Sequence, residues 1–86
     1  MQYLKDDNYL LTQMIFEYLM LSAKQDKAEF GMLGYVPLAH LELSFPDYCV
    51  ADIKASLRDL RQSRDIDVHP LGNKWCVSTK HWYRIK

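Results

Sequence analysis

The sequence lacks the features that mark a disulfide-stapled, secreted or membrane-spanning protein. Its 86 residues include two cysteines, Cys49 and Cys76, which form no C-x-x-C pair. We therefore expect reduced thiols in a cytoplasmic protein. The longest apolar run, residues 18–21, is far too short to cross a membrane. The first seven residues carry acids where a secretion signal needs a basic start and an apolar core, so no secretion signal is expected.

Catalytic signatures are also missing from the sequence. There is no G-x-G-x-x-G, phosphate-binding P-loop, H-E-x-x-H or G-x-S-x-G motif. The three histidines, His40, His69 and His81, fall in different expected elements. His69 and Cys76 would face each other on a hairpin, but a zinc site needs three or four ligands. The sequence predicts a protein that is not an enzyme and has no cofactor and no metal site.

The formal net charge is zero, but the charged residues are unevenly distributed along the chain. Residues 1–46 hold three lysines and six acidic residues, whereas residues 47–86 hold eight lysines and arginines and five aspartates. An acidic first half and a basic second half indicate a surface that faces a polyanion. Ordinary charge scatter on a small protein is the competing interpretation.

The first long segment, residues 8–23, has the pattern of a helix. Asp6, Asp7 and Asn8 are suitable N-caps for it. A core-facing stripe at helical spacing is formed by Leu11, Met14, Ile15, Tyr18 and Leu19. A second apolar stripe on the same helix contains Tyr9, Phe16 and Met20. This second stripe either wraps into the core or meets another subunit.

Three short segments follow in the middle of the chain. Tyr35 and Val36 precede Pro37 and are therefore expected to be extended. Residues 37–43 are expected to form a short second helix with Pro37 in its first turn. Residues 44–47 form a turn in this interpretation, and Asp47 is the expected N-cap of the next helix.

The third expected helix, residues 47–64, has an apolar face and two differently charged flanks. Its inward face contains Val50, Ile53, Leu57 and Leu60. Lys54, Arg58 and Arg61 make a basic stripe on one flank, and the two acids lie toward the other flank, at Asp52 and Asp59.

The segment from Ile66 to Thr79 alternates with the period of a β-hairpin. Gly72 and Asn73 have the character of a two-residue type II′ turn. That turn would pair Val68 with Val77, Pro70 with Trp75, and Ile66 with Thr79, all on one face. Residues 80–86 are expected to form a basic tail that contains the aromatic residues Trp82 and Tyr83.

This order of elements resembles the winged helix-turn-helix superfamily. The nine-residue string Ile53-Lys-Ala-Ser-Leu-Arg-Asp-Leu-Arg resembles the third helix of many small bacterial and phage members. The resemblance implies one α+β domain over residues 1–86, with three helices and a C-terminal β-hairpin wing. It further implies that the third helix enters the major groove of DNA and that the wing touches the backbone. A sizeable minority of the superfamily docks proteins instead.

The first functional hypothesis is a dimeric transcription regulator of bacterial, phage or plasmid type. Cations would neutralise phosphates, while the small Ala51 and Ala55 would let the helix approach base edges. A homodimer would double the contacts of one subunit. The residues assigned to double-stranded DNA are Tyr48, Lys54, Arg58, Arg61, Gln62, Asn73 and Lys74.

The second hypothesis is a protein-interaction module without DNA binding, such as a phage-encoded inhibitor or adaptor that docks on a larger host complex. The zero net charge, the acidic start of the third helix and the spare apolar stripe favour it. The residues assigned to an interface between subunits or with a partner are Tyr9, Phe16, Met20, Trp82 and Tyr83. In the competing interpretation, Phe16, Met20 and Trp82 close one core together.

Overall fold

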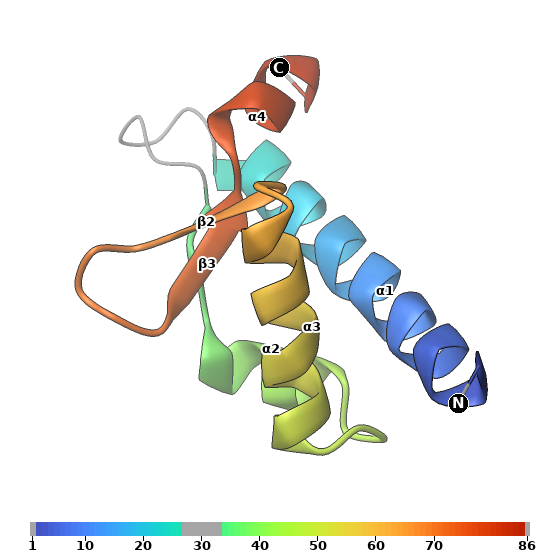
Figure 1. The fold of residues 1–86 in the computed structure, drawn as a ribbon. Coiled ribbons are helices and arrows are strands. Elements are labelled where there is room, and N and C mark those ends of the chain that lie inside the picture. The colour runs from blue at the N-terminus through green and yellow to red at the C-terminus, as the bar shows by residue number, and fades with distance from the viewer. Residues whose placement is uncertain (1, 27–33, 86) are drawn as a thin grey trace.

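The computed structural model describes residues 2–26 and 34–85. Four helices and three strands occur in these residues (Figure 1). They are α1 (Gln2–Asp26), β1 (Val36–Pro37), α2 (Leu38–Ser44), α3 (Val50–Gln62), β2 (Ile66–Val68), β3 (Lys74–Val77) and α4 (Thr79–Ile85). The expected α+β class is thereby confirmed. None of these helices is long and apolar enough to span a membrane.

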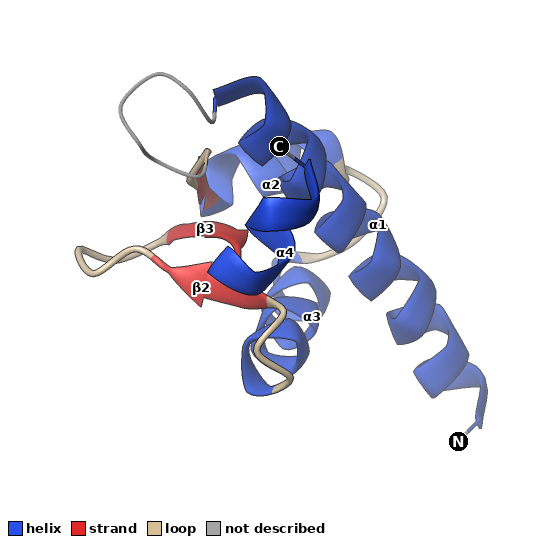
Figure 2. Cartoon of the chain, turned by 90° about the horizontal axis from the view of Figure 1, so that it is seen from above, coloured by secondary structure: helices blue, strands red, loops and turns tan. Residues whose placement is uncertain are grey.

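Helix α1 is longer than the sequence pattern predicted. It begins at Gln2 instead of residue 8, so Asp6, Asp7 and Asn8 lie inside the helix and the predicted N-cap is wrong. No glycine or proline occurs before Gly31 to break it. At 1.5 Å per residue its 25 residues span about 37 Å. The N-terminal half therefore extends away from the sheet, as two views show (Figures 1 and 2).

The core lies where α1 and α3 pack against each other and against the sheet. Helix α1 buries Leu11, Ile15 and Leu19 completely or almost so, whereas Met14, predicted inward, is exposed. Ala23 of α1 is buried as well, and the remaining buried apolar residues come from the three strands, α2 and α3: Val36, Leu41, Ile53, Leu57, Leu60, Ile66, Cys76 and Val77. Each fully buried Leu or Ile contributes about 1.5–3 kcal/mol of transfer free energy. A core of this composition fixes the position of α3 against α1.

Helices α2 and α3 begin later than expected. Pro37 belongs to β1, and α2 starts at Leu38. The Tyr48 N–H donates to the Phe45 carbonyl at 3.2 Å, which closes a turn and keeps Asp47 out of the helix. Cys49 is the N-cap of α3, without a side-chain capping bond, so Asp47 is not the N-cap.

The three strands form an antiparallel sheet in the order β1-β3-β2. The predicted strand at residues 35–36 is displaced by one residue, and Val36 lies opposite Trp75. The hairpin register differs by two residues from the prediction, because Ile66 pairs with Val77 and Val68 pairs with Trp75. A shift of two keeps every side chain on its predicted face.

The hairpin turn is built around Pro70 instead of Gly72 and Asn73. The Gly72 N–H donates to the His69 carbonyl at 3.1 Å, and the His69 N–H donates to the Lys74 carbonyl at 2.8 Å. Proline has the φ angle that the second position of such a turn needs. The predicted two-residue turn is therefore wrong.

Helix α3 ends in a Schellman motif. The Asp65 N–H donates to the Leu60 carbonyl at 2.9 Å, and the Arg64 N–H donates to the Arg61 carbonyl at 3.0 Å. Arg64 holds the left-handed position of this motif, with a φ of 65°. Glycine is the usual residue there, because a Cβ atom costs about 1–2 kcal/mol in this conformation.

Replacing Arg64 with glycine should therefore stabilise the domain by about 1 kcal/mol. The measurement is urea denaturation followed by circular dichroism. Arg61→Gly is the matched control: it removes the same charge inside α3, where glycine costs about 1 kcal/mol, and should destabilise. Equal effects of the two changes would contradict the assignment of backbone strain to Arg64.

Residues 80–86 were expected to form a tail, but the chain up to Ile85 is helical in α4. The Ser78 carbonyl accepts N–H bonds from His81 and Trp82, both at 3.0 Å, and so begins the helix. Trp82 packs against the core cluster. The fourth helix thus covers one end of α1 and adds an element to the three helices that were predicted.

Candidate functional site

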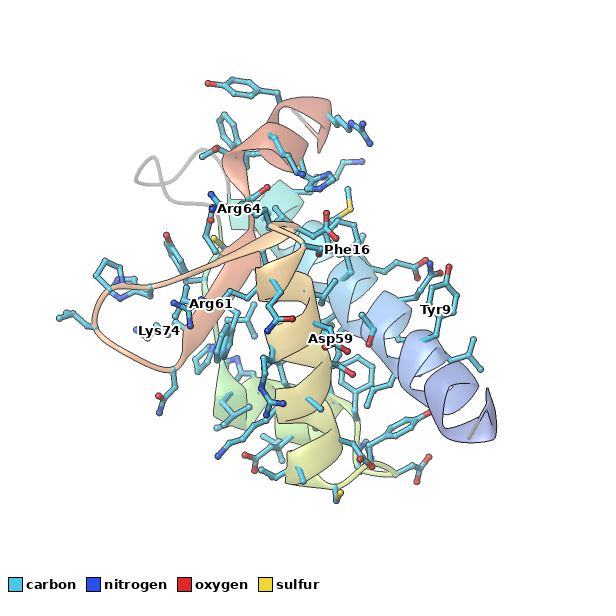
Figure 3. The ribbon with its side chains drawn as sticks, in the orientation of Figure 1. Tyr9, Phe16, Asp59, Arg61, Arg64 and Lys74 are labelled. Carbon is cyan, nitrogen blue, oxygen red and sulfur yellow. The ribbon has the colours of Figure 1, made fainter. Side chains whose placement is uncertain are left out.

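Cations and acids occupy opposite flanks of α3. Lys54, Arg58 and Arg61 are exposed and lie within one stripe, because spacings of four and three return to the same side of a helix. Figure 3 places Arg61 on the side of α3 that faces the hairpin, and Asp59 on the side that faces α1. The basic stripe is therefore not interrupted by the acids of the same helix.

The basic stripe continues beyond α3 onto neighbouring segments. Arg64, in the turn after the helix, and Lys74, at the start of β3, are both exposed and lie toward the hairpin (Figure 3). Among the side chains that the structure describes, residues 9–25 and 34–84, the acid–base contact within 4 Å is the one between Asp65 and His81, outside the basic stripe. We call Lys54, Arg58, Arg61, Arg64 and Lys74 the basic face. Its side chains are available to an anionic ligand.

The other residues assigned to DNA differ in accessibility. Gln62 and Asn73 are exposed, and the Asn73 carbonyl accepts the Leu38 N–H at 2.9 Å. Tyr48 lies in the turn before α3, is half-buried and packs against the core cluster. Arg64 was missed by the assignment of sites from sequence, although it directly follows Gln62 and Ser63 in the polar end of the helix.

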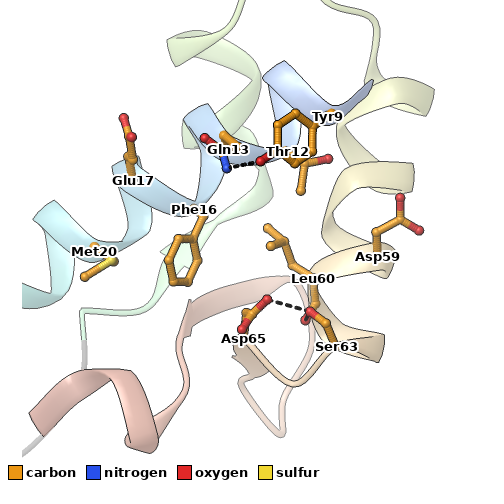
Figure 4. Close-up of a pocket in the computed structure, with 10 residues that line it drawn as sticks. All are labelled: Tyr9, Thr12, Gln13, Phe16, Glu17, Met20, Asp59, Leu60, Ser63 and Asp65. Atoms are coloured by element: carbon orange, nitrogen blue, oxygen red, sulfur yellow. Dashed lines mark hydrogen bonds between the residues drawn. The ribbon is translucent and has the colours of Figure 1, made fainter. Parts of the chain in front are cut away.

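A groove of about 850 Å³ lies on the opposite flank of α3, between that helix and α1 (Figure 4). Helix α1 supplies Tyr9, Thr12, Gln13, Phe16, Glu17 and Met20. The end of α3 and the following turn supply Asp59, Leu60, Ser63 and Asp65. Phe16 and Leu60 point toward one another between Glu17 on α1 and Asp59 on α3 (Figure 4). We call this feature the acidic groove.

The predicted interface residues separate into two groups. Tyr9, Phe16 and Met20 are brought together along the acidic groove. Phe16 and Met20 also pack against the core cluster, as does Trp82. Trp82 and Tyr83 lie on α4 with ring centroids 5.7 Å apart and do not line the groove. Phe16 and Met20 of the second stripe thus pack against the core, as one of the two alternatives stated, while Tyr9 is exposed. Contact of this stripe with another subunit stays a prediction.

One end of the acidic groove holds a fixed carboxylate. Asp65 Oδ2 accepts a hydrogen bond from Ser63 Oγ at 2.6 Å, and Asp65 Oδ1 lies 2.9 Å from His81 Nε2. The hydrogen bond from Ser63, followed by the contact with His81, lowers the pKa of the Asp65 carboxyl. The rings of His81 and Phe16 form a T-shaped pair with their centroids 5.1 Å apart. Asp65 is therefore an anion at neutral pH and is held in place.

The sequence did not predict the acidic groove, because its two walls come from segments far apart in the chain. Asp59 could be placed on the acidic flank of α3 by helical spacing. That Glu17 lies across from it follows from the crossing of α1 and α3, which no local pattern contains. Gln13 Nε2 donates to the Tyr9 hydroxyl at 2.8 Å and orders the far end of the groove.

The cysteine and histidine of the hairpin do not form the predicted pair. Asp67, not His69, lies opposite Cys76. Burial raises the pKa of the Cys76 thiol to about 11 and is also the largest cause that raises the pKa of Tyr35 to about 12. The thiol is thus protonated at neutral pH and is a poor nucleophile. The described residues contain no group of three or more side chains that could hold a metal ion.

Comparison with models of known protein families, with curated protein sequences and with solved structures gave no match.

Proposed function

We propose that the chain is a winged helix that binds duplex DNA as a small cytoplasmic transcription regulator of bacterial, phage or plasmid type. Under this proposal it is a binding module and not an enzyme. Helix α3 enters the major groove, and the β2–β3 hairpin is the wing that contacts the backbone. The order of the elements supports this assignment. Helix α2 is followed directly by α3, the β2–β3 hairpin follows α3, and β1 pairs with β3 of that hairpin.

The observation that carries the proposal is the separation of charge across α3. Arg61 lies on the hairpin side of α3, and Lys74 extends that surface (Figure 3). Lys54 and Arg58 share the stripe of Arg61 by helical spacing. Phosphate neutralisation supplies most of non-specific DNA affinity. Asp59 faces α1 instead, where it would not repel phosphates on the hairpin side. Gln62, on the exposed side of the helix, is the candidate for contacts with base edges.

A homodimer is the second part of the proposal. Leu10, Met14 and Leu21 are exposed on one stripe of α1, at 59%, 37% and 62% of their accessible areas. A large exposed apolar patch is a usual mark of a protein interface. Pairing two copies through this stripe would double the cations available to DNA. Sedimentation that shows only a monomer at high concentration would contradict this part alone.

The direct experiment is an electrophoretic mobility shift with fragmented bacterial genomic DNA at low and moderate salt. We expect retarded species at low salt with micromolar protein, and weaker binding as salt increases. No retarded species under the low-salt condition would refute the proposal. The alternative function, docking on a protein complex without DNA contact, predicts that outcome together with co-purification of a partner.

A further inference from the structure

We propose that the acidic groove binds an organic cation that carries an aromatic or apolar body. The site is separate from the basic face, because the two features lie on opposite flanks of α3. The inference therefore does not depend on DNA binding and can fail or succeed on its own.

The size of the groove fits a small molecule. Its volume of about 850 Å³ falls in the usual range of small-molecule sites, roughly 300–1,000 Å³. Ten residues line it, whereas a stable protein interface takes about 20–30 residues from each side. A ligand of drug-like size would fill the groove, and a protein partner would need a wider surface than the groove provides.

The charge of the groove selects a cation. Three of its lining residues are acids, Glu17, Asp59 and Asp65, and none is a lysine or arginine. Asp65 is already held by Ser63 and His81. Glu17 and Asp59 have no ion-pair partner among the residues that the structure describes. Glu17 comes from α1 and Asp59 from α3, and in Figure 4 both carboxylates point away from Phe16 and Leu60. They are therefore exposed at the sides of the groove, and both attract a cation that occupies it.

The apolar residues of the groove favour a ligand with an aromatic or apolar group. Phe16, Met20 and Leu60 are partly or largely buried and leave apolar surface toward the opening. The rings of Phe16 and Tyr9 add faces against which a cation with dispersed charge is favoured. A small hydrated ion would gain only the electrostatic attraction of the acids. A neutral hydrocarbon would gain only the burial of its apolar surface. An organic cation with an aromatic body gains both.

The test uses tetraphenylphosphonium and tetraphenylborate, which have nearly the same size and shape and opposite charge. Titration calorimetry with the wild-type chain at moderate salt should show binding of the phosphonium ion, with the borate at least about tenfold weaker. The Gln13 side-chain amide bonds to Tyr9 inside the groove, so its NMR signal should shift with the phosphonium ion. Equal affinity for both ions, or no binding of the phosphonium ion at millimolar concentration, would overturn the proposal.

A pair of double variants separates the groove from the net charge. Glu17→Gln with Asp59→Asn should weaken phosphonium binding about tenfold. Glu42→Gln with Asp67→Asn removes two exposed acids that do not line the groove, and should leave the affinity within about twofold. Equal losses in the two double variants would mean that the cation responds to net charge only and would contradict the site. Thermal melts of both variants check that the fold is retained.

Discussion

Replacing Gly34 with alanine should destabilise the domain by at least about 3 kcal/mol, which is the larger effect expected at the two glycines that the structure describes. Gly34 has a φ of +72°, which disfavours any residue with a Cβ. An added Cβ would lie 2.6 Å from the Ser22 carbonyl oxygen and 2.8 Å from the Ala23 Cα. Both are backbone atoms of α1, so no side chain can move aside. The free energy of unfolding of an 86-residue domain is roughly 4–13 kcal/mol, so this substitution would remove much of the stability.

Gly72 provides the matched control for Gly34. Its φ of +135° also disfavours alanine, but an added Cβ there meets no atom within 4 Å. Gly72→Ala should therefore cost only backbone strain, about 1–3 kcal/mol. Urea denaturation of both variants measures the difference, which isolates the close approach of the chain to α1. Equal destabilisation by the two substitutions would contradict the packing of Gly34 against Ser22 and Ala23.

The second large effect concerns DNA affinity. Changing Arg58 and Arg61 together to alanine should weaken binding to a short duplex roughly 50-fold at about 0.1 M salt. The estimate follows from two lost phosphate contacts, each of which changes the salt slope by about 0.9. Alanine is a good helix former, and both arginines are exposed, so α3 should remain intact. Fluorescence anisotropy with a labelled duplex gives the affinity and the slope.

Lys80→Ala with Arg84→Ala is the control for the arginine pair. It removes two exposed cations from α4, which lies away from the flank of α3 that carries the basic stripe. The net charge changes by the same amount, and the affinity should fall no more than a few-fold. Equal losses in the two double variants would mean that DNA responds to overall charge and not to α3.

Local pattern predicted the order of the elements up to β3 and the faces of α3 and the hairpin. Ile53, Leu57 and Leu60 are buried as their spacing indicated, while the cations at Lys54 and Arg58 remain exposed. These features depend only on helical and strand periodicity, which the sequence contains directly. Val50 was the exception: it was predicted inward and is 39% exposed, because it is the first residue of the helix.

The predictions that failed are those decided by competing local signals. Gly72 and Asn73 resemble a two-residue turn, but Pro70 closes a turn two residues earlier and sets the register. Asp6 resembles a helix cap, yet nothing before it breaks the helix. Ser78 directly precedes α4 and Thr79 is its first residue, and these residue types often begin helices. That signal was present and would have replaced the expected tail with a helix.

The acidic groove required information that no single segment holds. Its walls are set by where α1 crosses α3, and this crossing depends on the packing of Leu11, Ile15 and Leu19 against Ile53 and Leu57. Sequence reasoning could identify Tyr9, Phe16 and Met20 as a spare stripe. It could not place Asp59 and Asp65 opposite them.

The most direct test of DNA binding through the basic face is the salt dependence of wild-type affinity for a short labelled duplex. If all five cations of the basic face contact phosphates, the slope of log Kobs against log salt should be near −4.5 for one subunit. If some of them do not contact the DNA backbone, the slope should still be about −3 or steeper. Fluorescence anisotropy from about 50 to 200 mM salt measures it. A slope close to zero, or no binding at the lowest salt with micromolar protein, would contradict the account.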